Sequence, residues 1–215
     1  MKERPILFST PMVQAILGGT KTQTRRVVKP TPELVKIEMT DTEGYYLYDK
    51  KSRIGYSVEH GDAVEICPYG QIGDVLWVRE TWQYSQDELG NNSSTTKGDC
   101  FGKFLYKANG DTPDTWKPSI FMPREACRIR LKITDIRVEQ LHYISEDDAK
   151  AEGSPMYVMG HGVIDNSKLN ADPGYSSFIN YRMGFEHLWK SINGPESWDL
   201  NPFVWVISFE KIPSL

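Results

Sequence analysis

The sequence predicts an α+β fold, built as a small β-barrel with two or three helices and several inserted loops. Short segments that alternate apolar and polar residues recur along the chain, as in strands with one buried face, whereas helical spacing appears in only three places. The chain has 215 residues, of which 39% are hydrophobic. It is therefore long enough to bury one sizeable core, and we expect a single domain over residues 1–215.

The strongest strand signal is residues 73–82, where a Gly-Asp turn leads into alternating bulky residues. Residues 127–138 alternate over a longer stretch, and residues 203–209 form an apolar run near the end. Shorter strands are expected at 4–8 and 104–107. Residues 33–60 predict a β-hairpin with Gly44 at its turn. This hairpin, a polar stretch at 83–118 and a loop at 154–174 are interpreted as insertions.

Each predicted helix has a start signal. Thr10 before Pro11 predicts a hydroxyl-capped helix that ends at Leu17. Ser145 with an acidic residue three positions later predicts a short helix that ends at Glu152. The third helix is predicted from aromatic and aliphatic residues at helical spacing, which should form one buried stripe. These are Phe178, Tyr181, Phe185, Leu188, Trp189 and Ile192.

Charge is unevenly distributed along the chain. Residues 1–30 contain six basic residues and one acidic residue, a local charge of +5, and because the whole chain carries −4 the remainder carries −9. This pattern predicts one localised anion-facing site and argues against a general nucleic-acid coat protein.

The cysteines Cys67, Cys100 and Cys127 form no Cys-x-x-Cys pair, which favours thiols in a reducing compartment. There is no signal-like or membrane-length apolar segment. We therefore expect a soluble cytoplasmic protein with no membrane partner.

The stretch Gly18-Gly19-Thr20-Lys21-Thr22-Gln23-Thr24-Arg25-Arg26 holds the densest group of hydrogen-bond donors. Two glycines are suited to ending the preceding helix. The threonines, lysine and arginines could bind an anion or a polar base, and a lysine beside a threonine could perform chemistry. A solvated basic turn is the alternative interpretation.

The order of motifs resembles the ASCH domain family, a branch of the PUA-like barrels. The resemblance depends on a helix followed by Gly-Gly-Thr-Lys-Thr-x-Thr-x-Arg, then Gly-Asp-x-Leu-x-Val, then a strand leading into Ile-Ser-Glu-Asp-Asp-Ala-Lys-Ala-Glu-Gly. In length the chain is similar to the longer members found in bacterial viruses and prophages. Family members include an amidohydrolase that removes the acetyl group of 4-acetylcytidine, and ribonucleases.

The resemblance implies a catalytic set of Lys21, Thr24 and Glu152, with Arg26 matching a family arginine. It thereby implies a nucleoside or RNA as partner. We further expect Thr22, Arg25 and Arg26 to contact substrate. Arg79 and Glu80 are candidates for the same pocket, although an inter-strand ion pair fits them equally well.

Amide hydrolysis by these residues places demands on Lys21. As a base it would need its usual pKa of about 10.4 lowered by roughly two to three pH units, and Arg25 and Arg26 act in that direction. If Glu152 pairs with Lys21 directly, the lysine stays charged and stabilises an oxyanion, with glutamate or water as base. Positions 21 and 24 would face opposite ways in one strand, so the site requires a turn before the strand begins.

Three functions remain open from the sequence. The first is hydrolysis of an acylated cytidine such as 4-acetylcytidine, and the second is RNA binding or regulation without catalysis. A ribonuclease is the third, and a metal-dependent one ranks lowest because no acidic or histidine cluster has ligand spacing. No cofactor or metal is predicted, and His142 and His161 are interpreted as incidental.

Overall fold

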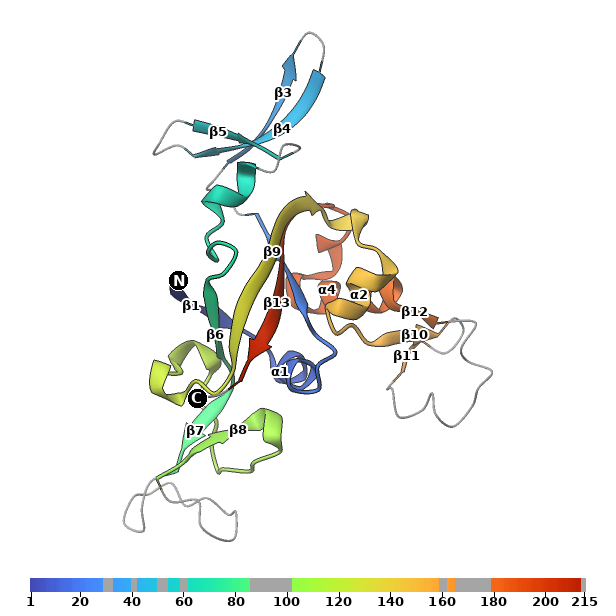
Figure 1. The fold of residues 1–215 in the computed structure, drawn as a ribbon. Helices are drawn as coiled ribbons and strands as arrows, with labels where there is room; N and C mark the ends of the chain where they lie inside the picture. The colour runs from blue at the N-terminus through green and yellow to red at the C-terminus, as the bar shows by residue number, and fades with distance from the viewer. Residues whose placement is uncertain are drawn as a thin grey trace.

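A computed structural model describes residues 1–28, 33–39, 42–49, 54–58, 62–85, 102–158, 162–164 and 179–213. Its main sheet has five strands in the order β1-β6-β9-β13-β2 (Figure 1). β1 runs parallel to β6, and the other neighbours are antiparallel. The strands are β1 (Glu3–Leu7), β2 (Gln23–Val27), β6 (Val75–Arg79), β9 (Arg130–Gln140) and β13 (Phe203–Ile212).

The α+β prediction is confirmed, and the prediction of a closed barrel is wrong. In the described part of the chain, β1 and β2 are the two edges of an open, mixed sheet and do not pair with each other. Arg26 in β2 reaches across to the end of β1, where its Nη2 donates to the main-chain oxygen of Leu7 at 2.7 Å. A side chain therefore joins the two edges where a barrel would have ladder hydrogen bonds.

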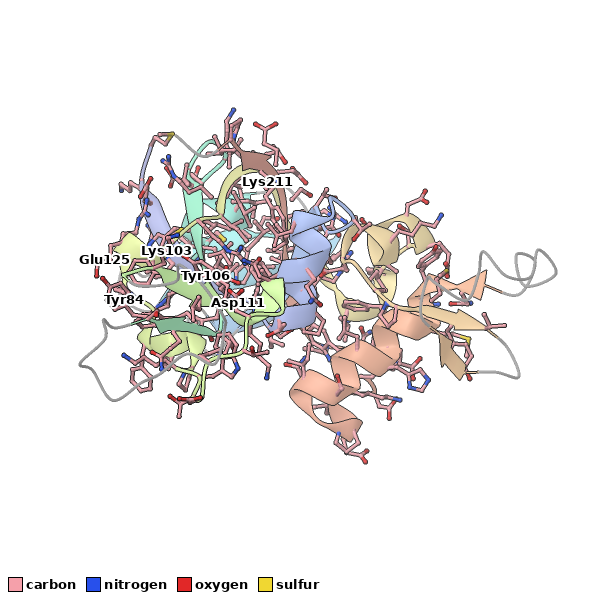
Figure 2. The ribbon with its side chains drawn as sticks, turned by 90° about the horizontal axis from the view of Figure 1, so that it is seen from below. Tyr84, Lys103, Tyr106, Asp111, Glu125 and Lys211 are labelled. Carbon is pink, nitrogen blue, oxygen red and sulfur yellow. The ribbon has the colours of Figure 1, made fainter. Side chains whose placement is uncertain are left out.

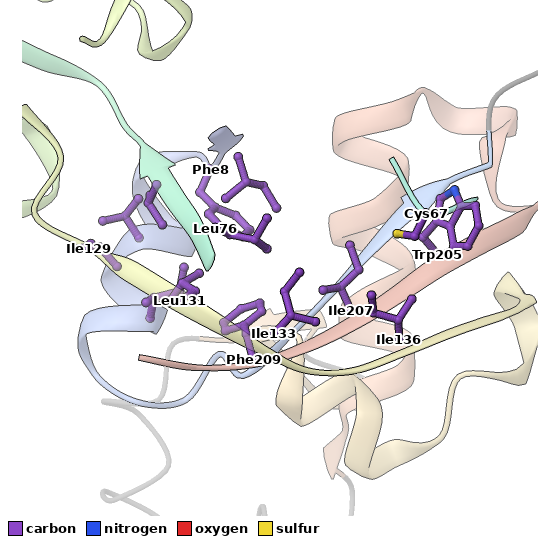
Figure 3. Close-up of a cluster of buried hydrophobic side chains, with 14 of the residues drawn as sticks. Phe8, Cys67, Leu76, Ile129, Leu131, Ile133, Ile136, Trp205, Ile207 and Phe209 are labelled. Carbon is purple, nitrogen blue, oxygen red and sulfur yellow. The ribbon is translucent and has the colours of Figure 1, made fainter. Parts of the chain in front are cut away.

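The sheet separates two apolar cores. On one face, Trp205, Ile207 and Phe209 of β13 pack with residues of β6, β9 and α1, as the cluster in Figure 3 shows. On the other face, Val204 and Val206 pack with Phe185, Trp189 and other residues of the C-terminal helix region. Because side chains alternate along a strand, one apolar run supplies both layers.

Three α-helices lie within the described residues: α1 (Thr10–Leu17), α2 (Glu146–Ala151) and α4 (Tyr181–Asn193). The predicted cap of α2 is confirmed, because the Ser145 hydroxyl accepts from the amide of Asp148 at 3.0 Å. The predicted cap of α1 is wrong: Thr10 is its first helical residue, and Ser9 stands at the N-cap without a side-chain hydrogen bond. Pro11 supplies a fixed φ in the first turn instead.

The α4 stripe is buried only in part. Phe185 and Trp189 are buried, whereas Ile192 is 54% exposed, which contradicts its predicted burial. Ile192 lies in the last turn, beyond the β-sheet surface that covers the two aromatic residues. Phe178 lies outside the described residues.

Other strand predictions are corrected as follows. The strand expected at 73–82 divides into β6 and β7 (Trp82–Tyr84), which belong to different sheets, because the chain leaves the main sheet at the buried Glu80. Gly44 lies within β4, opposite Ile37, and not at the hairpin turn. The expected 154–174 loop contains β10 (Met156–Val158) and β11 (Gly162–Ile164), which pair with each other.

The remaining strands form small sheets. β3 (Glu33–Met39), β4 (Thr42–Asp49) and β5 (Ile54–Ser57) form one, β7 pairs with β8 (Phe104–Tyr106), and β12 (Ile179–Asn180) joins β10. Short 3-10 helices are η1 (Asp62–Ile66), η2 (Lys107–Asn109), η3 (Ser119–Phe121), η4 (Arg124–Ala126), η5 (Leu141–Tyr143) and η7 (Pro195–Ser197). None of the helices in the described ranges combines the length and apolar composition needed to cross a membrane.

Candidate functional site

The donor-rich stretch forms a turn followed by an edge strand. Gly19 adopts φ 75°, which a residue with a side chain rarely does, and this allows the chain to reverse after α1. The amides of Thr20 and Lys21 both donate to the carbonyl of Ala15, and β2 begins only at Gln23. The turn that the site requires is therefore present, with Lys21 before the strand and Thr24 within it.

Lys21 and Glu152 are in direct contact, although 131 positions separate them. Nζ of Lys21 donates to Oε2 of Glu152 at 2.7 Å and to the main-chain oxygen of Glu152 at 2.7 Å. Their side chains are 0% and 3% exposed. An ammonium has three N–H groups, and the two bonds to Glu152 use two of them. The ion pair is therefore shielded from solvent, and two hydrogen bonds fix the position of the Lys21 ammonium.

Burial lowers the pKa of Lys21 below its ordinary value. The negative charge of Glu152 acts in the opposite direction and is the main opposing effect, while Arg26 and Arg25 add to the lowering. The predicted influence of the two arginines is thus present, but desolvation is the largest cause.

Arg25 holds the other oxygen of Glu152. Its Nη1 lies 3.3 Å from Oε1 of Glu152 and 2.6 Å from Oε1 of Gln23, and its Nη2 bonds to Glu139 at 2.6 Å and Asp148 at 3.1 Å. The guanidinium is fully buried and charge-compensated. Its guanidinium supports the site and is not a free cation for substrate phosphate. Arg25 nevertheless lines the adjoining cavity, so its predicted contact with substrate stays a prediction.

Sequence reasoning missed Glu139, Asp148 and Arg137. Arg137 joins the network through Glu139 at 2.9 Å and Asp148 at 3.0 Å. Burial alone would raise the pKa of Asp148, but Arg25 and Arg137 outweigh it and the net direction is downward. The four-residue spacing of Asp148 and Glu152 was an available signal, since residues at i and i+4 share a helix face.

A cavity of about 320 Å³ lies along the edge of β2. One wall is formed by four residues of β2: Thr24, Arg25, Arg26 and Val27. Leu7 at the end of β1, Ser9 just after it, and Glu152 also line the cavity. Its lining is completed by Met12, Tyr69, Phe185, Leu188, Trp189, Ile192 and Asn193. The cavity thus occupies the gap between the two sheet edges, and the structure brings Thr24 and Glu152 to the same space.

The outer edge of β2 presents main-chain groups to this cavity. Thr22 and Val28 each bond to β13 or its flanking residues, so by alternation the amides and carbonyls of Arg25 and Val27 point away from β13. Neither residue has another main-chain partner among the described residues. The Thr24 hydroxyl also forms no hydrogen bond within that part of the chain. Polar groups without partners at a cavity wall are suited to binding a ligand.

No protein-family model, no curated protein and no solved structure matches this chain.

Arg26 faces the cavity but is engaged at its tip. Besides the bond to Leu7, its guanidinium lies 5.2 Å from the ring centroid of Phe8. Burial lowers the pKa of Arg26, and Tyr69 and Glu152 oppose this. Arg26 therefore contributes a fixed positive charge at the cavity wall, and its predicted contact with substrate stays a prediction.

The remaining predicted residues lie elsewhere. Thr22 is exposed and lines a neighbouring cavity. Arg79 donates to the main-chain oxygens of Met122 and Ile120, and Glu80 is held by two 2.9 Å bonds from Arg128. Neither lines the Thr24 cavity.

Glu80 belongs to the β7–β8 end of the molecule. The guanidinium of its partner, Arg128, stacks 4.0 Å from the ring centroid of Tyr106. Figure 2 shows Tyr106 on this side, away from α4. The ion-pair alternative for Glu80 is the one observed, with Arg128 as the partner.

The described ranges contain no group of three or more His, Cys, Asp or Glu side chains arranged to hold a metal. His142 is half-buried, with Nε2 2.9 Å from the carbonyl of Trp198, so it serves packing. His161 and Cys100 lie outside the described residues. Burial raises the pKa of the Cys67 thiol to about 11, which makes this residue unreactive.

Proposed function

We propose that this protein is a PUA-like protein of the ASCH type that hydrolyses the amide of an acylated cytidine, with 4-acetylcytidine as the representative substrate. The observation that carries the proposal is that Thr24 and Glu152 line one cavity, while Lys21, which does not line it, is bound to the Glu152 carboxylate. The cavity volume is at the lower end of ligand pockets, which suits a ligand of nucleoside size.

The walls of the cavity provide for both parts of such a substrate. Phe185 and Trp189 supply apolar surface against which a planar base can pack. The outward amides of Arg25 and Val27 are donors of the kind that stabilise the oxyanion of acyl transfer. A preformed strand edge keeps these donors fixed, so little reorganisation is needed during reaction.

Thr24 acts as the nucleophile in this proposal. Its Oγ forms a bond to the acyl carbon, its proton passes to the Glu152 carboxylate, and the oxyanion is held by the strand-edge amides. When the C–N bond breaks, Glu152 returns the proton to the departing cytidine nitrogen. Water then hydrolyses the acyl-threonine to the free acid and restores the hydroxyl.

Lys21 is a positioning residue in this scheme. It does not line the cavity, and its ammonium is bound to Glu152 at two oxygen atoms. Its charge fixes the position of the Glu152 carboxylate and offsets the cost of burying it. The direct pairing thus favours the assignment in which lysine keeps its proton.

The test is hydrolysis of 4-acetylcytidine, followed by release of cytidine. Thr24→Ser retains a hydroxyl and should keep measurable kcat, whereas Thr24→Val is nearly isosteric and should lose about 10³-fold or more, as for a removed nucleophile. Lys21→Met should lower kcat with little change in cytidine binding. Equal activity in Thr24→Val and wild type, or no turnover by wild-type protein, would refute the proposal.

RNA binding without catalysis is less well supported. Of the cations in the stretch, Lys21 and Arg25 are buried and bound to carboxylates, so they are not available for phosphates. Salt-dependent RNA binding that persists in Thr24→Val, with no product formed, would nevertheless favour that function.

A further inference from the structure

A second cavity, of about 740 Å³, adjoins the first. Met12 of α1 and Leu188 of α4 line both cavities, and Glu152 of the first cavity is flanked by Ala151 and Gly153 of the second. The two spaces therefore meet between α1 and α4 and lie on either side of the segment that carries Glu152. In Figure 1 the elements around this junction, α1, α2 and α4, converge beside β2. A ligand that occupies both cavities would pass between Met12 and Leu188.

The lining of the second cavity combines neutral polar groups with one cation. Gln14, Thr20, Thr22, Ser154 and Tyr181 supply amide and hydroxyl groups. Apolar surface comes from Pro11, Met12, Ala15, Ala151, Pro155 and Leu188. The described lining includes no acidic side chain.

Two observations indicate a ligand with many hydrogen-bonding groups. Ser154 is 8% exposed, and its Oγ is buried without a partner, which is costly unless a ligand or water satisfies it. Lys150 lies over the ring of Tyr181 at 5.2 Å. Its other side-chain contact among the described residues is Asp147 at 3.4 Å, where the aspartate side chain is 94% exposed. That exposed pair is weak, so Lys150 can bind a ligand anion.

The geometry points to the second cavity as the subsite for the ribose and phosphate of the acylated nucleotide, with Lys150 as the phosphate contact. This inference rests on the proposed function, which places the base and its acyl group in the first cavity. Hydroxyl and amide groups beside an aromatic ring suit a sugar, and one lysine suits one phosphate. A longer phosphate-tracking groove would need more cations than this lining has.

The experiment compares kcat/KM for 4-acetylcytidine, its 5′- and 3′-monophosphates, and a trinucleotide with the acetylated base in the middle. At low salt we expect at least one phosphate-bearing substrate to exceed the nucleoside by about tenfold, as for one charge-assisted hydrogen bond. The two monophosphates identify the position that is read. A gain confined to the trinucleotide identifies an internal phosphodiester.

Lys150→Gln should reduce this ratio to near one. The matched control is Lys190→Gln, because Lys190 also forms a helix-surface pair, with Glu186, but does not line the cavity. Ser154→Ala tests the sugar contact and should raise KM for all of the substrates by a similar factor. Each variant is compared with wild type by thermal unfolding to verify its folding.

Failure of this inference is distinguishable from failure of the proposed function. Turnover of 4-acetylcytidine with no preference for phosphate, or a preference that survives Lys150→Gln, overturns the subsite alone. If no substrate is turned over, the hydrolase is refuted. Calorimetric affinities of cytidine and its monophosphates for wild type and Lys150→Gln then test the subsite: a loss of the phosphate preference in the variant supports it, and equal affinities overturn it.

Discussion

Substituting Glu152 by glutamine should destabilise the protein far more than the same change at an exposed ion pair. The substitution preserves shape but leaves Lys21, whose side chain is 0% exposed, without its counter-charge. Removing one partner of a buried pair costs about 3–5 kcal/mol. We expect about 3 kcal/mol, because the glutamine oxygen can still accept a hydrogen bond from Lys21.

The matched control is Glu186→Gln. Glu186 and Lys190 also lie 2.7 Å apart, but their side chains are 34% and 32% exposed, so water replaces the lost charge. The expected loss is about 0.5 kcal/mol or less. In urea unfolding with a slope of about 3 kcal/mol per M, Glu152→Gln should lower the midpoint by about 1 M and the control by less than about 0.2 M.

The pH dependence gives an independent check. Burial lowers the pKa of Lys21 in the folded state, and loss of the Glu152 charge should lower it further. Between that pKa and the ordinary value near 10.5, the unfolded chain binds more protons than the folded one, so stability rises with pH. Because this window opens at a lower pH in the variant, the penalty of Glu152→Gln should shrink as pH rises from the Lys21 pKa of the variant to that of wild type, and should stay constant above it.

Two results would contradict this reasoning. Equal losses in Glu152→Gln and Glu186→Gln would mean that burial does not strengthen the pair. A double variant, Lys21→Met with Glu152→Gln, removes both charges and should recover at least half of the loss. No recovery would place the cost in packing or in the lost contact with Arg25, and not in the unpaired ammonium.

Three further predictions concern other features. Above the lowered pKa of Lys21, kcat/KM for 4-acetylcytidine should fall as pH rises, because the ammonium that holds the carboxylate is lost; a rise would make the neutral amine the base. Gly153→Ala should cost more stability than Gly110→Ala in thermal unfolding, by about 1–2 kcal/mol. Both glycines have positive φ, but an added Cβ at Gly153 lies 2.9 Å from a neighbouring side chain, whereas nothing lies within 4 Å at Gly110; equal losses would refute the packing argument. Glu80→Gln should lower the midpoint of unfolding because Arg128 loses its partner, and it should leave KM unchanged; a raised KM would return Glu80 to the substrate site.

Local sequence patterns predicted the strands of the main sheet well where burial of one or both faces selects apolar residues. The alternation at 127–138 corresponds to β9, and the apolar run at 203–209 corresponds to most of β13. Local patterns could not predict whether the sheet closes into a barrel, because closure depends on hydrogen bonding between β1 and β2. Ladder bonds between distant strands leave no periodic signal in either strand.

The site was predictable only in part. The turn at Gly18 and Gly19 and the position of Lys21 followed from local chemistry, whereas the pairing with Glu152 was implied by resemblance and not by any local pattern. The network around Arg25 gives little signal of its own in the sequence, because the spacing of Ser145 and Asp148 already predicts a helix cap. In the structure the amide of Asp148 donates to the capping hydroxyl of Ser145, while its carboxylate binds Arg25 and Arg137. Asp148 therefore serves both the helix start and the site.

The unpaired edge of β2 has a consequence for aggregation. A strand with free amides and carbonyls is a template for pairing with another chain. Here that edge lies at the wall of a cavity bounded by α1 and α4, so a second molecule cannot approach it without displacing residues such as Leu188 and Trp189. Substitutions that shorten these side chains to admit bulkier ligands would therefore also expose the unpaired edge of β2. The risk of intermolecular strand pairing then limits how far this cavity can be widened.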